Sequence, residues 1–568
     1  MSSSLLSHPD QELHDHLLGV QQLANYFLGS RQVNMWDSGL LKDLLTITTL
    51  AHDFGKSTTF FQRYITDPNL GTKKGGPLAS HSLLSAIVGY FMAKEYLGTH
   101  PQATKLSFFI YLAIKRHHGN LRDISDEYAS FSNKDRELLL KQIQAIDYSS
   151  LKIIWPQLIN KLPAPLNQWP PLKRGTLEKW VNDFKGELRQ VRMLWLQNTS
   201  RGTPLFGEQP DTHDIDIGDL QDYFQFLFLY SLLLDADKNQ AGVKNYPRAL
   251  NDALTENLVD NFKKKKKWKQ VGINILREKA YQEIAGNLQL ADHGKIFSIT
   301  LPTGLGKTLA AYNFAFKLRE KRFNESGIAP KIIYALPFLT VIDQNYQVLS
   351  DILHAEGISG HHVLTKHHHL ADPEFIDGDE VNYQPNAAKL LIEGWASQIV
   401  VTTFMQLFNT LIGWRNSSLR RFHRLSQAII IIDEIQAIPI CYWNLVQKAL
   451  EYLAQHMSTD IILVTATLPK IFTGTSAALE LSQPKKYFTK MNRVKMEINL
   501  SRRTIEQFAH DEIKKELLAN PNKSFLFIMN TISSAKELYR EIEKLTNEPI
   551  GLLVSSKSRQ VSHLSCSR

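Results

Sequence analysis

The chain has 568 residues, too many for one compact core, and this length predicts roughly three or four domains. Hydrophobic residues make up 43% and charged residues 21%, as in ordinary globular proteins, and no apolar run approaches the ~18 residues of a membrane span. The net charge of +9 suits a polyanionic partner. Two cysteines exclude a disulfide framework and a thiolate zinc site, which fits a reducing cytoplasm.

Residues 1–250 are predicted to form a helical domain. Apolar residues recur there at spacings of three and four, as in HLLGVQQLANYFL and LLSAIVGYFMAKEYL, with few β-branched alternations. His52 and Asp53 stand side by side in this apolar context, and further histidines and aspartates occur in or at the ends of other predicted helices. These are His16, His81, His117, His118, Asp237 and, as a near neighbour of the last, Asp235.

Imidazole nitrogen and carboxylate oxygen together suit Mn, Fe, Co, Ni or Mg-type ions. Each histidine taken singly has a plain alternative, a core histidine without a ligand, but the ordered set favours a metal site.

Residues 251–288 are predicted to be a basic linker. KKKKKWKQ concentrates positive charge there. This run either binds a polyanion or is simply a set of solvated lysines. From about residue 289 short β-rich runs alternate with helical patterns, which predicts a parallel α/β sheet. These runs are KIFSIT, KIIYAL, QIVVTTF, AIIIIDE, DIILVT and SFLFIMNT. SGHHVLTKHHHLAD, with five histidines, is predicted to be a polar loop rather than a metal site.

LPTGLGKT follows one predicted strand and opens a predicted helix, the context of a phosphate-binding loop. Gly304 and Gly306 allow the backbone N–H groups to face phosphates at the helix N-terminus. Lys307 would reach the β- and γ-phosphates, and Thr308 would place its hydroxyl on Mg²⁺. The first glycine of the usual pattern is a leucine here, so a chance glycine-rich turn is the alternative.

AIIIIDEIQAI predicts a buried strand that ends in Asp433 and Glu434. Asp433 would hold Mg²⁺ and Glu434 would polarise the attacking water. An acidic pair after a strand is otherwise typical of a helix start, but its pairing with GKT in this order favours a nucleotide site.

These motifs carry a family resemblance. LPTGLGKT, DEIQ and TAT resemble motifs I, II and III of superfamily 2 helicases, and YALPFLTVIDQN and IVVTTFMQL resemble the motifs that touch the nucleic-acid backbone. LPFLTVIDQN and DEIQAI are similar to those of the CRISPR-associated nuclease-helicase of type I systems. The resemblance covers most of residues 290–550. It implies a first RecA-like domain over 289–495 and a nucleotide-binding set of Thr303, Gly304, Gly306, Lys307, Thr308, Asp433 and Glu434.

The same resemblance implies an all-α HD nuclease domain before the helicase. One metal ion would be held by His16, His52, Asp53 and Asp237, and a second would share Asp53 and take His81, His117 and His118. Two such ions clamp a phosphodiester. Lys56 would stabilise charge on the phosphate, with a solvated lysine as the alternative. Asp53, Lys56 and Glu434 are thus the expected catalytic residues.

The implied function is a metal-dependent single-stranded DNA nuclease, acting as endonuclease or exonuclease, coupled to an ATP- and Mg-dependent helicase that degrades invading DNA. Single-stranded and duplex DNA and an RNA-guided surveillance complex are the implied partners. An HD phosphohydrolase acting on nucleotides and a DNA-binding remnant without motor activity are the alternatives. SFLFIMNTISSAKELYREI and EPIGLLVSSKSRQ look like the start of a second RecA-like domain over 496–568. Because no arginine motif follows, that domain is expected to be truncated, with poor ATP hydrolysis.

Overall fold

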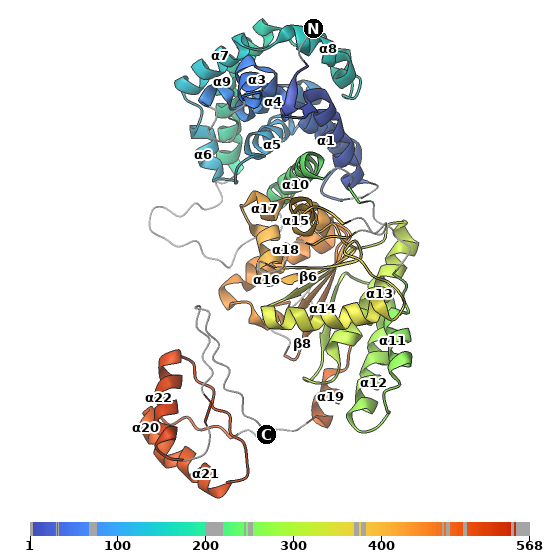
Figure 1. The fold of residues 1–568 in the computed structure, drawn as a ribbon, viewed down its shortest axis with the longest axis vertical. Coiled ribbons are helices and arrows are strands. Elements are labelled where there is room, and N and C mark those ends of the chain that lie inside the picture. The colour runs from blue at the N-terminus through green and yellow to red at the C-terminus, as the bar shows by residue number, and fades with distance from the viewer. Residues whose placement is uncertain are drawn as a thin grey trace. The chain divides into compact units, whose positions relative to one another are not determined.

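The computed structural model forms two compact units, Met1–Met491 and Asn492–Arg568, and each is described by itself. Figure 1 shows the N-terminal helices of the first unit gathered at one end and its sheet, flanked by further helices, at the other. The structure describes residues 4–29, 31, 33–67, 76–198, 220–243, 246–247, 254–368, 374–376, 382–467, 471–472, 478–491, 497–546 and 550–551.

The N-terminal region of the first unit is helical, as predicted. Its helices are α1 (Leu13–Leu28), α2 (Ser38–Ala51), α3 (Thr59–Ile65), α4 (Ser82–Leu97), α5 (Ala103–Arg116), α6 (Ile124–Ala129), α7 (Asn133–Gln144), α8 (Tyr148–Ile159), α9 (Arg174–Asn198) and α10 (Gln221–Gly242). A two-stranded antiparallel sheet precedes them, formed by β1 (Leu6–His8) and β2 (Gln11–Glu12). α10 is buried along most of its length because helices and the sheet domain cover it from several sides.

A seven-stranded parallel sheet forms the second part of the unit, with strand order β5-β6-β4-β7-β8-β3-β9. The strands are β3 (Ile296–Thr300), β4 (Ile332–Leu336), β5 (Leu364–His367), β6 (Ile399–Thr403), β7 (Ile429–Asp433), β8 (Asp460–Thr465) and β9 (Leu479–Glu480). The helices α13 (Lys307–Ser326), α14 (Leu339–His354), α15 (Pro385–Glu393), α16 (Phe404–Ile412), α17 (Asn416–Leu419), α18 (Trp443–His456) and α19 (Pro484–Lys490) connect or flank them. The predicted fold class, a helical region followed by a RecA-like domain with a parallel sheet, is confirmed.

Side chains alternate between two cores across this sheet. On β4, Ile333 and Ala335 belong to a hydrophobic core that continues into the N-terminal helices, whereas Ile332, Tyr334 and Leu336 belong to the core beneath α13 and α14. This division follows from the two-residue period of a strand. On that side α16 and α18 contact the strands, and α10 packs in turn on α15 and α17, so one hydrophobic core runs from the sheet to the N-terminal helices.

The segment assigned as a basic linker forms two helices, α11 (Leu258–Lys266) and α12 (Ile273–Gly286), and both pack against α13. Val259 and Ile284 are fully buried in this contact. The lysine run extends α11 with exposed side chains, and Lys267 ends the helix in the left-handed conformation.

The histidine-rich stretch is not simply a loop, because β5 runs through it from Leu364 to His367 and pairs with β6. The imidazole of His367 is buried and its Nδ1 accepts a hydrogen bond of 3.0 Å from Trp395 Nε1. His369 lies outside the described residues. A four-residue strand that ends in lysine and histidine carries little apolar signal, so its sequence resembles that of a loop.

The second unit contains α20 (Ile505–Phe508), α21 (Lys514–Ala519) and α22 (Ile532–Glu543), packed on a small core. The strand predicted in SFLFIMNT is wrong, because the described residues there are extended without strand pairing, and Leu526 and Ile528 are each 82% exposed. Within the described part of this unit no neighbouring strand offers hydrogen bonds to them. EPIGLLVSSKSRQ lies almost wholly outside the described residues.

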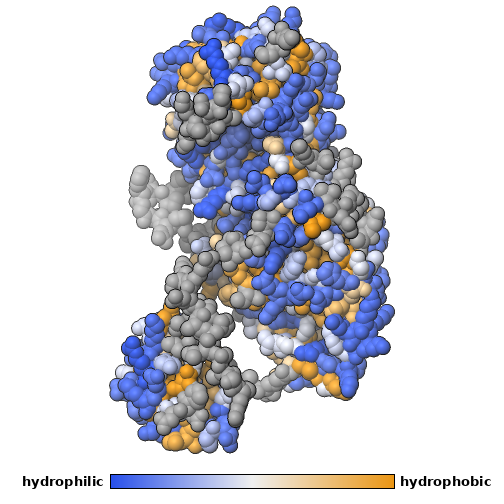
Figure 2. Space-filling model, in the orientation of Figure 1, coloured by the Kyte–Doolittle hydropathy of each residue, from blue (hydrophilic) through white to orange (hydrophobic). Residues whose placement is uncertain are grey.

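The surface carries no sign of a membrane segment within the described ranges. None of the described helices combines the length and the apolar composition that crossing a bilayer requires. Figure 2 shows hydrophilic residues over most of this face of the first unit, with hydrophobic residues in small groups between them.

Candidate metal centre and nucleotide site

Helix ends and one helix interior bring the predicted metal ligands together. His16 lies in the first turn of α1, and His52 ends α2 directly before Asp53. His81 precedes α4, and His117 ends α5 just before His118. Asp237 projects from the buried helix α10 and completes the set. Residues separated by more than two hundred positions thus meet in one place.

The ligand atoms form two groups. His16, His52 and Asp237 make one group, in which one donor atom from each residue lies within 4.8 Å of the others. Its imidazole Nε2 atoms are 3.3 Å apart, and Asp237 Oδ1 lies 3.4 Å from His16 Nε2 and 3.6 Å from His52 Nε2. Asp53, His81, His117 and His118 make the other group.

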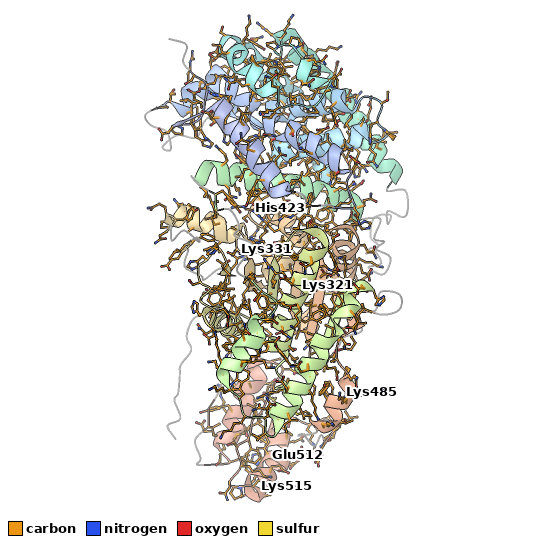
Figure 3. The ribbon with its side chains drawn as sticks, turned by 90° about the vertical axis from the view of Figure 1, so that its right-hand side faces the viewer. Lys321, Lys331, His423, Lys485, Glu512 and Lys515 are labelled. Atoms are coloured by element: carbon orange, nitrogen blue, oxygen red, sulfur yellow. The ribbon has the colours of Figure 1, made fainter. Side chains whose placement is uncertain are left out.

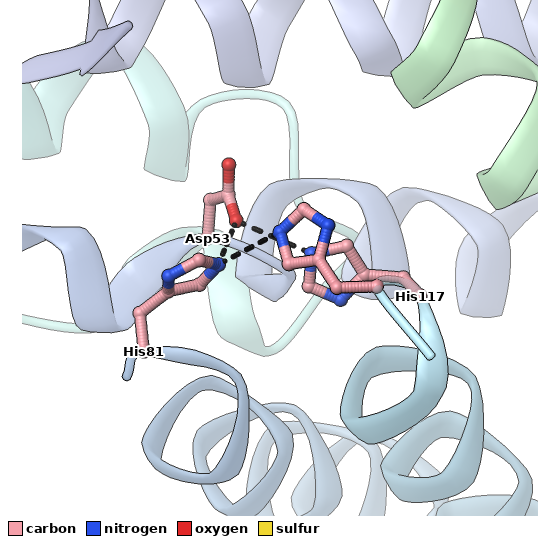
Figure 4. Close-up of side chains that lie close together, drawn as sticks. Asp53, His81 and His117 are labelled. Atoms are coloured by element: carbon pink, nitrogen blue, oxygen red, sulfur yellow. Dashed lines mark hydrogen bonds and ion pairs between the residues drawn. The ribbon is translucent and has the colours of Figure 1, made fainter. Parts of the chain in front are cut away.

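Asp53 contacts both groups with different oxygens. Its Oδ2 lies 3.2 Å from His16 Nε2 and 3.5 Å from His52 Nε2. Its Oδ1 lies 3.0 Å from His81 Nε2 and 3.5 Å from His117 Nε2, as Figure 4 shows. A carboxylate held in this way has the orientation of a bridging ligand between two cation positions.

Hydrogen bonds fix the tautomers of three of these histidines. The Nδ1 of His52 donates to Thr49 O at 2.7 Å, and that of His117 donates to Ile114 O at 2.5 Å. His16 Nδ1 donates to the side-chain oxygen of Gln240 at 2.5 Å. With the proton on Nδ1, the lone pair of each Nε2 faces the site, as metal ligation requires.

The buried donors fit divalent cations. Asp53 is 1% exposed, and its oxygens are held by close contacts with imidazole nitrogens and with the ammonium of Lys56. Burial raises the pKa of Asp53, but His52, Lys56 and His81 outweigh it and hold that pKa well below its usual range. Burial also raises the pKa of Asp237, but the contacts with His16 and His52 outweigh it and hold that pKa well below its usual range. Ionised carboxylates beside free imidazole nitrogens are a donor set for transition-metal ions.

Lys56 is buried rather than solvated, with only 4% of its surface exposed. Its ammonium lies 2.6 Å from Asp53 Oδ2 and 5.4 Å from the ring centre of Phe61. His8, which was not predicted, also reaches this site, with its ring centre 5.0 Å from that of His16. Burial, the charge of Lys56 and His16 lower the pKa of His8 to about 4.

Asp235, two residues before Asp237 on α10, points away from the metal ligands and into the sheet domain. Its Oδ1 accepts from Arg420 at 2.6 Å, and its Oδ2 accepts from Arg424 at 2.9 Å. All three side chains are at least nine-tenths buried. Asp235 therefore links the helical region to the sheet instead of joining the metal groups.

The nucleotide motifs meet at the carboxyl ends of β3, β7 and β8, which are neighbours in the sheet. Gly304 and Gly306 have φ of +84° and +78°, the left-handed conformation that glycine adopts without strain. Lys307 begins α13, and its Nζ lies 3.3 Å from Glu434 Oε1.

Asp433 ends β7, and its Oδ2 accepts a hydrogen bond of 2.7 Å from the hydroxyl of Tyr334. Burial raises the pKa of Asp433. Glu434 follows with a φ of +57°, a strained conformation for a residue with a side chain and typical of functional sites. Gln436 donates to Glu434 and accepts from Thr465 at 2.7 Å, so it joins the DEIQ motif to the TAT motif.

The comparisons with known proteins agree with this geometry. The family model for DEAD/DEAH box helicases matches residues 278–473. The CRISPR-associated nuclease/helicase Cas3 of Haloferax volcanii is 24% identical over 555 residues, a match that covers 88% of this chain and 57% of the relative. The chain is thus similar to Cas3 along most of its length. The predicted relationship to the nuclease-helicases of type I systems is thereby confirmed.

A crystal structure of T. fusca Cas3 has the same fold, with a TM-score of 0.52 at 16% identity. The match covers 94% of the present chain and 62% of that structure. The chain therefore spans about three fifths of the length of the proteins that it matches.

The segment predicted to be a linker lines the candidate nucleotide site. A cavity of about 480 Å³ opens beside the glycine-rich loop, and residues of α11, α12 and their connection form its other wall. They are Lys263, Trp268, Gln270, Asn274, Arg277, Glu278 and Tyr281. Arg277 Nε donates to Gly304 O at 2.8 Å and thus contacts the loop directly. The one sequence feature that could have indicated this contact is that the lysine-rich segment lies shortly before the glycine-rich loop in the chain.

Proposed function

We propose that this Cas3 homologue is a metal-dependent nuclease for single-stranded DNA, coupled to an ATP-dependent helicase motor. The observation that supports it most is Asp53, whose two oxygens face two separate groups of imidazole and carboxylate donors. The first cation would be held by His16, His52, Asp53 and Asp237, and the second by Asp53, His81, His117 and His118. Mn, Fe, Co and Ni suit these donors.

Bound divalent cations supply Lewis acidity toward a phosphodiester and lower the pKa of water. The protein's own part is to hold the donors in place. Lys56 pairs with the Oδ2 of Asp53, keeps this carboxylate ionised, and brings a positive charge to the position where a scissile phosphate would lie. The exposed imidazole of His118 marks the side from which a strand would enter.

The helicase domain implies ATP and Mg as cofactors. Lys307 and Thr308 would bind the phosphates and Mg²⁺, Asp433 would hold Mg²⁺ and Glu434 would orient the attacking water. The segments after β4 and β6 reach the same edge of the sheet, where Phe338 and Met405 are 61% and 68% exposed. Exposed apolar side chains between polar ones suit a single strand of nucleic acid.

The antiviral setting follows from the relationship to Cas3. We place the protein in the cytoplasm, with single-stranded and duplex DNA as substrates and an RNA-guided surveillance complex as the partner that delivers them. The helicase would separate strands, and the nuclease would cut the exposed one.

The test is cleavage of circular single-stranded DNA by the purified chain with Mn²⁺, Co²⁺ or Ni²⁺. Asp53→Ala should lower the cutting rate at least about a hundredfold, beyond the ~10–100-fold that loss of an outer-shell partner costs. Asp10→Ala removes an exposed carboxylate from the same region and should leave the rate unchanged. Near-normal cutting by Asp53→Ala would refute the metal assignment. Phosphate release from free nucleotides without DNA cutting would favour an HD phosphohydrolase instead.

Gln240 offers a readout that does not depend on cleavage. Gln240→Leu removes the acceptor that holds the proton of His16 on Nδ1, so Co²⁺ binding measured by calorimetry should weaken about 10–100-fold. Gln22→Leu, on the exposed face of the same helix as His16, is the matched control. Equal Co²⁺ affinity in the two variants would contradict the proposed role of His16.

Lys307→Ala separates the two activities. It should weaken ATP binding while metal-dependent cutting of single strands persists, because the nucleotide loop and the metal groups lie in different parts of the unit. Loss of cutting in a correctly folded Lys307→Ala protein would argue against two independent sites.

A further inference from the structure

A second cavity lies on the side of the sheet opposite the nucleotide site. It measures about 260 Å³ and is formed at the amino ends of β4, β6 and β7, where Lys331, Gln398 and Gln427 precede the three strands. The end of α1 closes it with Tyr26 and Phe27. Figure 3 labels Lys331 and His423 at this level, between the helical region and the sheet. Neither the metal groups nor the nucleotide motifs reach this cavity.

Four cationic side chains line the cavity and no acidic side chain does so. They are Arg31, Arg319, Lys331 and Arg424. Asp235 is the carboxylate next to Arg424, and it is shared with Arg420. The one carboxylate balances only part of the positive charge of the lining, and burial together with Arg424 lowers the pKa of Lys331 well below its usual range. A buried site tolerates such an excess of cations poorly without a counter-ion.

Neutral acceptors hold three of these cations in position without balancing their charge. Arg319 donates to Pro330 O at 3.0 Å, to Leu254 O at 3.1 Å and to Gln398 Oε1 at 2.9 Å. Lys331 donates to the carbonyls of residues 396 and 397, and Arg31 donates to Phe27 O. The donors are thus oriented in advance, as in a binding site.

Arg424 carries an unsatisfied donor at the cavity. Its side chain is nine-tenths buried, and its Nη2 donates to Asp235 and, at 2.7 Å, to the hydroxyl of Tyr246, but its Nε has no hydrogen-bond partner. The guanidinium lies 4.5 Å from the ring centre of Phe27, which fixes its plane. Arg31 Nε is likewise buried without a partner. Burial and the nearby Arg424 lower the pKa of Arg31 to about 10, as expected for crowded cations.

We propose that this cavity binds a small phosphate-bearing anion. Guanidinium and ammonium donors match phosphate oxygens, and two unsatisfied Nε–H groups remain to donate to them. A volume of about 260 Å³ accommodates a single phosphate group or a mononucleotide but not a length of DNA. The ring of Tyr26, which is 43% exposed, offers a surface for a base. The site rests on neither nuclease nor ATPase activity.

Calorimetric titration of the full chain tests this proposal. Lys307→Ala serves as the parent so that the nucleotide loop does not compete, and metal-free buffer removes cations that would bind phosphate at the His/Asp groups. Inorganic phosphate and deoxyadenosine 5′-monophosphate are the probes. We expect one phosphate per chain, and we expect Arg31→Gln to weaken binding about tenfold or more, the effect of losing one charged hydrogen-bond donor.

Arg174→Gln is the matched control, because Arg174 is an exposed arginine outside the cavity. Arg31 is partly exposed, so its substitution should leave the fold intact, and Lys331→Met provides a second loss of charge inside the cavity. Tighter binding of the deoxynucleotide than of phosphate would identify a mononucleotide ligand, and equal binding would identify phosphate alone. Absence of binding, or equal affinity of Arg31→Gln and Arg174→Gln, would overturn the proposal.

Discussion

Asp235→Asn should destabilise the first unit strongly, although Asp235 lies outside both sites. The substitution keeps the side-chain shape and removes the charge that pairs with Arg420 and Arg424. All three side chains are at least nine-tenths buried. Removing one partner of a buried ion pair costs about 3–5 kcal/mol because the other charges stay buried without compensation.

The expected shift can be calculated from the size of the unit. Unfolding entropy is about 2.1 cal/mol/K per residue, which gives ~1 kcal/mol/K for the unit Met1–Met491. The melting temperature in differential scanning calorimetry should therefore fall by about 3–5 °C. Asp222→Asn on the same helix breaks the solvent-accessible pair with Lys105 and should cost only about 0.2–1 kcal/mol. Equal shifts for the two variants would refute the reasoning about burial.

Two further predictions concern the nucleotide site. Gly304→Ala places a side chain at a φ of +84° and should weaken ATP binding. Gly327→Ala, at a φ of +70° outside that site, should carry similar backbone strain and leave ATP affinity unchanged. Equal ATP affinity in both variants would contradict the role of the loop. Tyr334→Phe removes a hydrogen bond that lowers the pKa of Asp433, which burial already raises, so on acidification Mg·ATP binding should be lost at a higher pH than in the parent. Tyr312→Phe, whose hydroxyl bonds a backbone carbonyl, should show the pH profile of the parent, and identical profiles for both tyrosine variants would count against the Tyr334 argument.

The sequence predicted those sites whose residues lie next to one another in the chain. The glycines of LPTGLGKT and the acidic end of the isoleucine strand indicate a nucleotide site because strand, turn and helix follow one another directly. The His/Asp set was recognisable by residue type and by its placement at helix ends. Its division into two groups around Asp53 depends on how helices from distant segments pack, which no spacing reveals.

The roles of other residues depend on which distant segments pack against them, and the sequence pattern alone indicated these roles only weakly. Gln240 follows Asp237 by three residues and so shares its helix face, but a lone glutamine suggests no chemistry until His16 is placed beside it. Asp235 resembled a metal ligand in sequence and turned out to pair with arginines almost two hundred residues away. The extended residues of SFLFIMNT show the reverse case, since a strand pattern without a pairing partner forms no sheet.

The continuous core bears on how the proposed metal site and the nucleotide site depend on each other. One hydrophobic core runs from the N-terminal helices to one face of the sheet, and α10 carries both Asp237 and Asp235. The packing is therefore continuous across residue 250, where the sequence pattern changes from helical to alternating helix and strand. Asp237, a proposed cation ligand, and Asp235, which pairs with Arg420 and Arg424 of the sheet domain, lie on the same helix. A rotation of the sheet against the helices would move Asp237 away from the other proposed cation ligands, so the proposed nuclease and helicase sites are coupled through α10.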